Sequence, residues 1–178
     1  MKGPIVVLLF LLPLCVSAQG VFTNQTNTAL QKVISDYPNN FRNIRGQMIN
    51  EDPQTTDYSS NVQIPGAGNA IITKYSSDSN REVYSWKCMI IESEEFEVAA
   101  KRYKELYNQI RNSIVKIDGE KPLILNGNYE APTEEKRFVA SSFGLVPANG
   151  KLGKVKVELA LEFYVTEWKI SLLVFDQE

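Results

Sequence analysis

Two glutamates near the C-terminus have the spacing that carboxylate chemistry would use. Glu158 and Glu162 stand four residues apart in an alternating segment, so both should project from one face of a strand. At about 3.3 Å per residue they lie about 13 Å apart, whereas glycosidase carboxylates lie roughly 5 to 9.5 Å apart. Lys154 and Lys156 precede them. We therefore interpret the glutamates as part of a solvated, charge-paired sheet face.

Other catalytic and metal-binding patterns are weak. The chain contains no histidine, which excludes His-based triads, dyads and metal sites. Ser113 and Lys116 match a Ser-x-x-Lys spacing, but only at the end of a predicted helix. The loop pairs that could hold calcium do not resemble a twelve-residue calcium loop. They are Asp52 with Asp57 and Asp78 with Asn80. We predict no catalytic residue, no cofactor and no metal ion.

Two aromatic residues indicate a possible binding surface. Tyr164 and Trp168 follow the alternating segment that carries Glu158 and Glu162. If all four share the polar sheet face, they form an amphipathic patch suited to a partner or a glycan, because Tyr and Trp are enriched at such contacts. For each aromatic residue taken singly, placement in the core is the favoured alternative.

The first eighteen residues have the pattern of a cleaved export signal. A positive start at residues 1–3 is followed by an apolar run over residues 4–14 and small residues at 16–18. The apolar run is shorter than the roughly 20 residues of a membrane span. We expect a mature chain that begins at Gln19, is soluble, has no integral membrane span and works in the periplasm or outside the cell. Residues 19–178 have the length of a single domain.

Composition restricts the partners of this domain. The net charge of −2 becomes −3 when Lys2 is removed with the signal. That mild acidity offers no electrostatic footprint for nucleic acid or anionic lipid. Cys15 lies inside the signal, so Cys88 is left alone and no internal disulfide can form. A buried position is the favoured interpretation of Cys88, because free cysteine packs as a small hydrophobe.

Apolar periodicity predicts a helix near the mature N-terminus. Apolar residues recur at helical spacing over residues 28–37. Pro38 cannot continue the hydrogen-bond ladder, so it should kink this helix or start a second short one. The second piece would bury Phe41 and Ile44.

A second, longer helix separates two groups of strands. Ser93 is its predicted cap, and an apolar stripe runs over residues 96–114. The remaining apolar runs predict strands, of which the last should be central because both of its faces carry large residues. These runs cover residues 47–51, 58–64, 69–75, 81–91, 123–125, 136–145, 155–166 and 168–175.

The order of these elements predicts an α+β fold. We expect two helical segments packed on one face of a mostly antiparallel sheet, in the order helix, strands, helix, strands. Residues 37–44 and 106–113 share Asn, Arg and Asn at matching places, 69 residues apart. This echo raises the possibility of a weak internal duplication.

Three features together carry a family resemblance. They are the signal peptide, the stretch Pro-Asn-Asn-Phe-Arg-Asn-Ile-Arg-Gly at residues 38–46, and Tyr-Glu-Ala-Pro-Thr-Glu-Glu-Lys at residues 129–136. In these features the chain resembles the uncharacterised small exported α+β proteins of bacteria. The resemblance implies no activity and transfers no functional residue.

These observations favour a non-catalytic binding or interaction module. The expected partner is a protein, a glycan or a small apolar ligand, and not nucleic acid. One alternative is a carrier that holds a small apolar ligand between the long helix and the sheet. A third hypothesis is a carboxylate-dependent hydrolase, which would need two acids that converge in a cleft.

Overall fold

The structure is a computed structural model that describes residues 25–76, 82–111, 113–117, 119, 121–147 and 150–176. The predicted signal peptide at residues 1–18 and the start of the mature chain at Gln19 lie outside the described residues. Within these ranges, no helix combines the length and the apolar composition that a membrane crossing requires. The elements are α1 (Gln25–Asp36), η1 (Tyr37–Asn39), β1 (Arg45–Glu51), β2 (Thr55–Ser60), β3 (Asn69–Tyr75), β4 (Val83–Ser93), α2 (Phe96–Arg111), β5 (Ile114–Val115), β6 (Leu123–Gly127), β7 (Phe138–Val146), η2 (Gly150–Lys154), β8 (Val155–Tyr164) and β9 (Glu167–Asp176).

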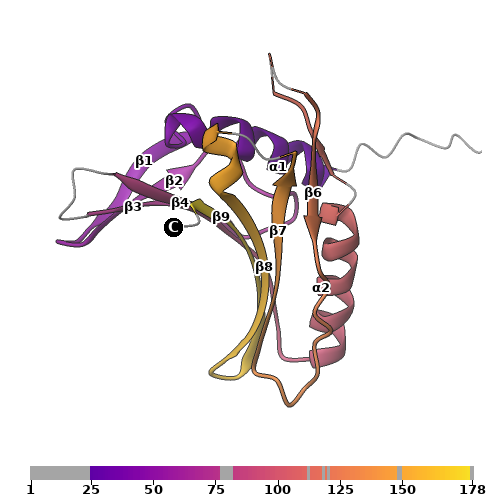
Figure 1. Cartoon of the computed structure of the whole chain (residues 1–178). Helices are drawn as coiled ribbons and strands as arrows, with labels where there is room; N and C mark the ends of the chain where they lie inside the picture. Colours follow the sequence, from indigo (N-terminus) through magenta and orange to yellow (C-terminus); the bar gives the residue numbers. More distant parts are fainter. Residues whose placement is uncertain are drawn as a thin grey trace, which may run out of the picture.

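Among the described residues, nine strands form one sheet in the order β1-β2-β3-β4-β9-β8-β7-β6-β5. Every neighbouring pair is antiparallel. The α+β class with a mostly antiparallel sheet is therefore confirmed, as is the central position of the last strand. The sheet bends strongly along β8 and β9, so it has a convex and a concave side (Figure 1).

The topology repeats one arrangement twice. Each helix is followed, directly or after β5, by a four-strand meander, first β1 to β4 and then β6 to β9. The last strands of the two meanders, β4 and β9, pair antiparallel at the centre of the sheet. The two similar segments of the sequence adopt different structures. Residues 37–39 form a 3-10 turn, whereas residues 106–111 form the end of α2.

A single apolar cluster of described residues combines side chains of both helices with side chains of the sheet. Each side chain that is fully buried there contributes roughly 1.5–3 kcal/mol. Cys88 belongs to the cluster and has no exposed surface, which confirms its predicted core position. Burial also raises the pKa of its thiol. The largest fully buried side chains come from both helices, from the sheet and from the segments that connect them, namely Trp86, Tyr103, Phe41, Phe143, Leu30, Ile34, Ile64, Ile72, Leu106, Ile110, Leu125 and Leu159.

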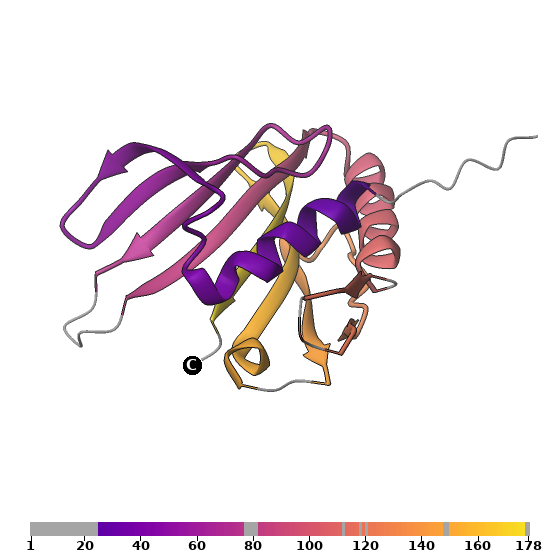
Figure 2. The ribbon, with the colours of Figure 1, turned by 90° about the horizontal axis from the view of Figure 1, so that it is seen from above.

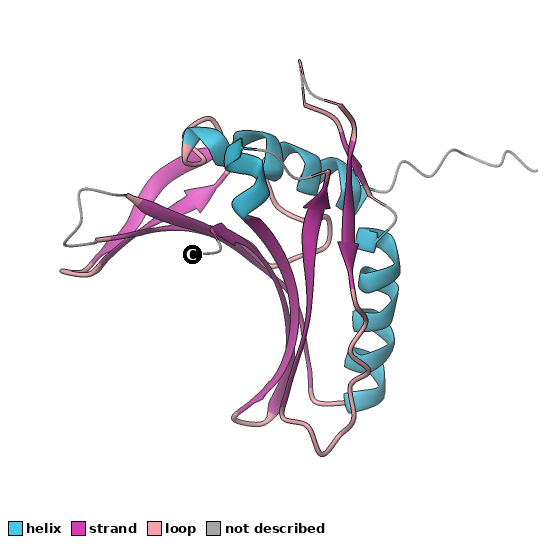
Figure 3. Cartoon of the chain, in the orientation of Figure 1, coloured by secondary structure: helices cyan, strands magenta, loops and turns pink. Residues whose placement is uncertain are grey.

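The long helix begins and ends for local reasons. The Ser93 hydroxyl accepts a hydrogen bond from the Glu95 backbone N–H at 3.1 Å, just before the first turn of α2. The apolar stripe of α2 faces β4, β6, β8 and β9. The helix runs alongside these strands in Figures 1 and 3. The prediction that the stripe extends to Ile114 is wrong, since Ile114 lies in β5 and is 53% exposed. The Ser113 hydroxyl, which bonds to Asn27 of α1, lies at the point where the chain turns out of the helix.

Two tyrosine hydroxyls fix α2 to the β6–β7 region. Tyr107 donates to the Gly127 carbonyl at 2.9 Å, and Tyr103 donates to the Ser141 hydroxyl at 2.8 Å. A Cβ on Gly127 would lie 2.3 Å from the Ser142 carbonyl oxygen, so only glycine fits this contact. Burial raises the pKa of Tyr103 to about 12.

The segment after α1 differs from the prediction. In place of a second short helix, the chain makes the single 3-10 turn η1, and Asn40 and Phe41 then both take a φ of 55°. The buried Asp36 carboxylate accepts hydrogen bonds from the backbone N–H groups of Asn43 at 2.9 Å and Ile44 at 3.2 Å. These bonds compete with helix formation, because a short acidic side chain can satisfy backbone donors locally. Phe41 and Ile44 are buried as predicted.

Candidate functional site

Three of the four predicted site residues lie on one face of the sheet. This open face, opposite the core cluster, carries the side chains that alternate with the core residues of β8 and β9. Glu158 pairs in register with Leu173, and Glu162 pairs with Lys169. Tyr164 lies on the same face at the end of β8 and is 62% exposed.

The placement of Trp168 corrects the predicted patch. Trp168 pairs in register with Phe163, whose side chain points to the core face. It is only 4% exposed, and its ring centroid lies 4.9 Å from that of Phe96 and 5.1 Å from that of Phe163. Trp168 is therefore a core residue and does not share a surface with Glu158 and Glu162.

The two glutamates lie among other polar and charged side chains. Lys169, opposite Glu162, forms an ion pair with Glu92 at 2.9 Å. The Ser142 hydroxyl donates to Glu158 at 3.4 Å. Among the described residues, no group of three or more acidic or cysteine side chains is placed to hold a metal ion. The glutamates thus belong to a mixed polar surface of the kind expected for contacts with another molecule.

The open face contains a hollow of about 490 Å³ beside Glu158. Leu173 and Phe175 are half-buried in its lining. Tyr75 is 42% exposed, and its hydroxyl lies 3.1 Å from the Ser85 hydroxyl. We call this feature the open-face hollow. Its lining residues are Tyr75, Val83, Tyr84, Ser85, Glu158, Leu173, Phe175 and Asp176.

Sequence reasoning identified Glu158 of this hollow but missed its apolar lining. Leu173 and Phe175 alternate with core residues of β9, so a signal was present in the strand period. It was not decisive, because the last strand is apolar on both faces and its two sides look alike. The curvature of the sheet turns this face into a hollow, and no pattern of neighbouring residues in the sequence indicates that curvature.

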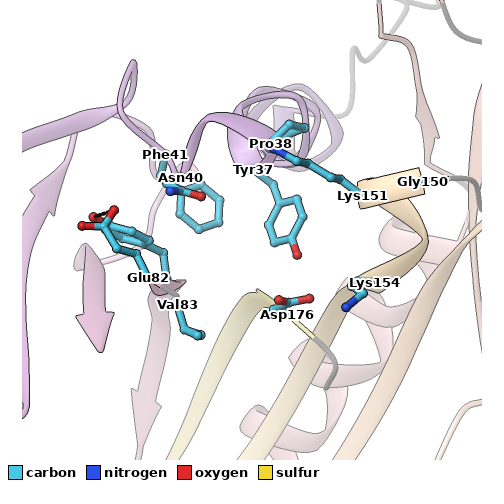
Figure 4. Close-up of a pocket in the computed structure, with 11 residues that line it drawn as sticks. Tyr37, Pro38, Asn40, Phe41, Glu82, Val83, Gly150, Lys151, Lys154 and Asp176 are labelled. Atoms are coloured by element: carbon cyan, nitrogen blue, oxygen red, sulfur yellow. Dashed lines mark hydrogen bonds between the residues drawn. The ribbon is translucent and has the colours of Figure 1, made fainter. Parts of the chain in front are cut away.

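A second pocket lies where the turns η1 and η2 meet the ends of β4 and β9 (Figure 4). Its volume is about 450 Å³. We call it the turn pocket. Figure 2 shows α1 running across the sheet, from the end beside α2 toward the turn that follows it. Four separate segments of the chain supply the lining, which consists of Tyr37, Pro38, Asn40, Phe41, Glu82, Val83, Tyr84, Gly150, Lys151, Lys154 and Asp176.

One wall of the turn pocket is held in a sparsely populated backbone conformation. Asn40 and Phe41 both have positive φ, which is common for asparagine but rare for a bulky aromatic residue. The buried Asp36 carboxylate holds this turn from behind, with a further hydrogen bond from the Asn39 side-chain amide at 3.1 Å. The Phe41 ring packs edge-on against Tyr37, with centroids 6.0 Å apart. The wall is therefore rigid and shaped before any ligand arrives.

Charges of both signs line the turn pocket. Lys151 and Lys154 come from η2, and Figure 4 shows the Tyr37 hydroxyl pointing toward the Asp176 carboxylate and the Lys154 ammonium. Glu82 lies on the other side and forms an ion pair with Lys74 at 2.7 Å. The hydrogen bond from Lys74 lowers the pKa of Glu82, so Glu82 is ionised at neutral pH.

Comparison with known proteins assigns no function. No family model matches the chain, and no curated protein or solved structure matches it either. The chemistry of the open face and of the turn pocket is therefore what bears on function.

Proposed function

We propose that this protein is an exported, non-catalytic binding module that engages a partner protein through the open, concave face of its sheet. The observation that carries the proposal is the open-face hollow, which combines the apolar side chains Leu173 and Phe175 with the carboxylate of Glu158. Interfaces between proteins use this combination of a desolvated apolar centre and a polar rim.

The arrangement of helices supports this choice of face. In Figure 1 both helices lie toward the convex side of the bend. Leu30, Val33 and Ile34 of α1 belong to the same apolar cluster as the stripe of α2. We infer that both helices cover the convex face and that the partner covers the concave one.

The residues around the hollow indicate how a partner would dock. Lys87 and Glu158 flank Leu173 in register on the neighbouring strands, and Lys156 flanks Phe175. An apolar side chain of the partner would enter between them, while its polar neighbours meet the charged rim. Anchors of this kind carry most of the binding free energy at interfaces.

Export is the second part of the proposal. It is supported by the charged start, apolar run and small residues at positions 1–18. Mass spectrometry of protein from the native extracytoplasmic fraction tests it. We expect the mass of a chain that begins at Gln19, and an intact chain that retains Met1 or Lys2 would refute processing.

Site-directed photo-cross-linking in the native host tests the binding face. A photoreactive residue replaces Leu173 in one variant and Lys104, on the exposed side of α2, in a matched control. We expect a covalent adduct of defined mass from position 173 and none from position 104. Adducts from position 104 alone, or equal adducts from both positions, would contradict a role for the concave face.

The carrier and hydrolase hypotheses stay predictions. Native mass spectrometry of the protein from its source would reveal a small apolar passenger as an added mass. Turnover of glycoside or ester substrates that disappears in a Glu158→Gln variant would reveal a hydrolase.

A further inference from the structure

A second binding site, which adjoins the open-face hollow and shares Val83, Tyr84 and Asp176 with it, is built into the turn pocket. We propose that it binds a free α-amino acid with an apolar side chain. The pocket offers a carboxylate and an ammonium group to one end of such a ligand and an aromatic wall to the other (Figure 4).

The charged end of the ligand is matched by Asp176 and Lys154. Figure 4 shows these two side chains facing the same part of the pocket, below the Tyr37 hydroxyl. In an α-amino acid the ammonium and carboxylate groups stand on one carbon atom, so they need opposite charges that lie side by side. A ligand with a single charge would meet one attractive and one repulsive partner.

The lysines of η2 are available for this role. Lys151 and Lys154 are both exposed, and neither forms an ion pair with any residue that the structure describes. Lys154 therefore supplies the charge for a ligand carboxylate. The Asp176 carboxylate, which also interacts within the protein, supplies the charge for the ligand's ammonium group.

The opposite part of the pocket is aromatic and apolar apart from Glu82, whose carboxylate is paired with Lys74. Tyr37, Phe41 and Val83 line it, and the volume of about 450 Å³ lies within the usual range of about 300 to 1,000 Å³ for small-molecule sites. A branched or aromatic side chain of the ligand would pack against these residues. This wall accounts for the preference for an apolar amino acid over glycine.

The positive φ of Asn40 and Phe41 supports a binding role for this wall. Residues in sparsely populated backbone conformations cluster at ligand sites, where the surrounding structure holds them in place. Here the Asp36 carboxylate provides that support through its bonds to Asn43 and Ile44. A wall shaped in advance lowers the entropic cost of binding a small ligand.

Calorimetric titration of the mature protein with three related probes tests the proposal. L-Phenylalanine carries both charges, 2-phenylethylamine lacks the carboxylate, and 3-phenylpropanoate lacks the ammonium group. We expect phenylalanine to bind about tenfold or more tightly than either analogue, because each analogue loses a charge-assisted hydrogen bond. Absence of phenylalanine binding at millimolar concentration would overturn the proposal. So would an analogue that binds as tightly as phenylalanine.

Substitutions locate the binding site. Lys154→Gln should weaken phenylalanine binding about tenfold and should not weaken 2-phenylethylamine, because it removes a repulsive charge from that ligand. Asp176→Asn should weaken phenylalanine and, for the same reason, not 3-phenylpropanoate. Lys32→Gln, on the exposed side of α1, is the matched control and should bind like the wild type. Lys154 is exposed, so its replacement leaves the core intact, and a thermal unfolding curve verifies this. Wild-type affinity in both Lys154→Gln and Asp176→Asn would overturn the assignment.

Discussion

Replacing Tyr103 with phenylalanine should destabilise the protein at neutral pH and stabilise it at strongly alkaline pH. Tyr103 has no exposed surface, and its hydroxyl donates to Ser141 at 2.8 Å. Loss of that bond costs about 1 kcal/mol at pH 7. Burial raises the pKa of Tyr103 to about 12 in the folded state, compared with about 10 in the unfolded chain.

The sign of the alkaline effect follows from this difference in pKa. The neutral phenol is favoured by folding, so its contribution is complete below about pH 10 and is lost as the pH rises through 12. The difference in pKa therefore lowers the free energy of unfolding of the wild-type protein by about 1.4 kcal/mol at pH 11 and by about 2 kcal/mol at pH 12. The phenylalanine variant has no such loss. The stabilities of the two proteins should therefore cross between about pH 10 and pH 11.

Denaturant unfolding across this pH range measures the effect. The fluorescence of Trp86 and Trp168, both buried, reports the folded state. Ionisation of the other tyrosines occurs in both proteins and cancels in the difference. Ser141→Ala is the control, because it removes the same hydrogen bond but keeps the phenol and hence the alkaline decline. A stability difference that stays constant from pH 7 to 12 would refute the reasoning.

Three further predictions concern the packing and the pocket wall. Gly127→Ala should lower the free energy of unfolding by about 1–3 kcal/mol, because there is no space for the added Cβ. Gly144→Ala is the control and should be tolerated. Equal denaturation midpoints for the two variants would contradict the prediction. Asp36→Asn should cost about 1.5–3 kcal/mol by weakening the bonds that hold the turn after α1, and Glu51→Gln, on an exposed edge, should cost little in the same assay. The Cys88 thiol should resist an aromatic disulfide reagent at pH 8 until denaturant is added, and rapid labelling of the native protein would show that it is accessible.

Local patterns predicted much of the secondary structure. Apolar runs identified β3 at residues 69–75 and most of β9. The period of two identified β8, because alternation reports which side of a strand is buried. The period of 3.6 identified α2. Residues 37–44 are the segment whose secondary structure was not predicted. The buried Asp36 carboxylate shapes this segment through hydrogen bonds that extend as far as Ile44, eight residues later. Such a bond leaves no helical or strand periodicity in the sequence.

The candidate site was less predictable than the elements that carry it. The sequence allowed Trp168 to share a surface with Glu162, with a core position as the favoured alternative. Trp168 faces the core because the hairpin between β8 and β9 pairs it with Phe163. A change of one residue in a hairpin register exchanges the two faces of a strand. Val165 in that hairpin has a positive φ of 59°, which nothing in its residue type indicates.

The sequence by itself determined the helices, most strands, the buried state of Cys88 and the absence of histidine chemistry. These features depend on residue type and on spacing within a few residues. Only the tertiary structure decided the sheet order, its curvature and the assembly of the turn pocket from residues 37–41, 82–84, 150–154 and 176. The physical reason is that strand pairing brings together residues that are far apart in the sequence, such as Trp86 and Val174. Backbone hydrogen bonds between strands are the same for nearly every residue type, so the pairing leaves little trace in the sequence of either segment.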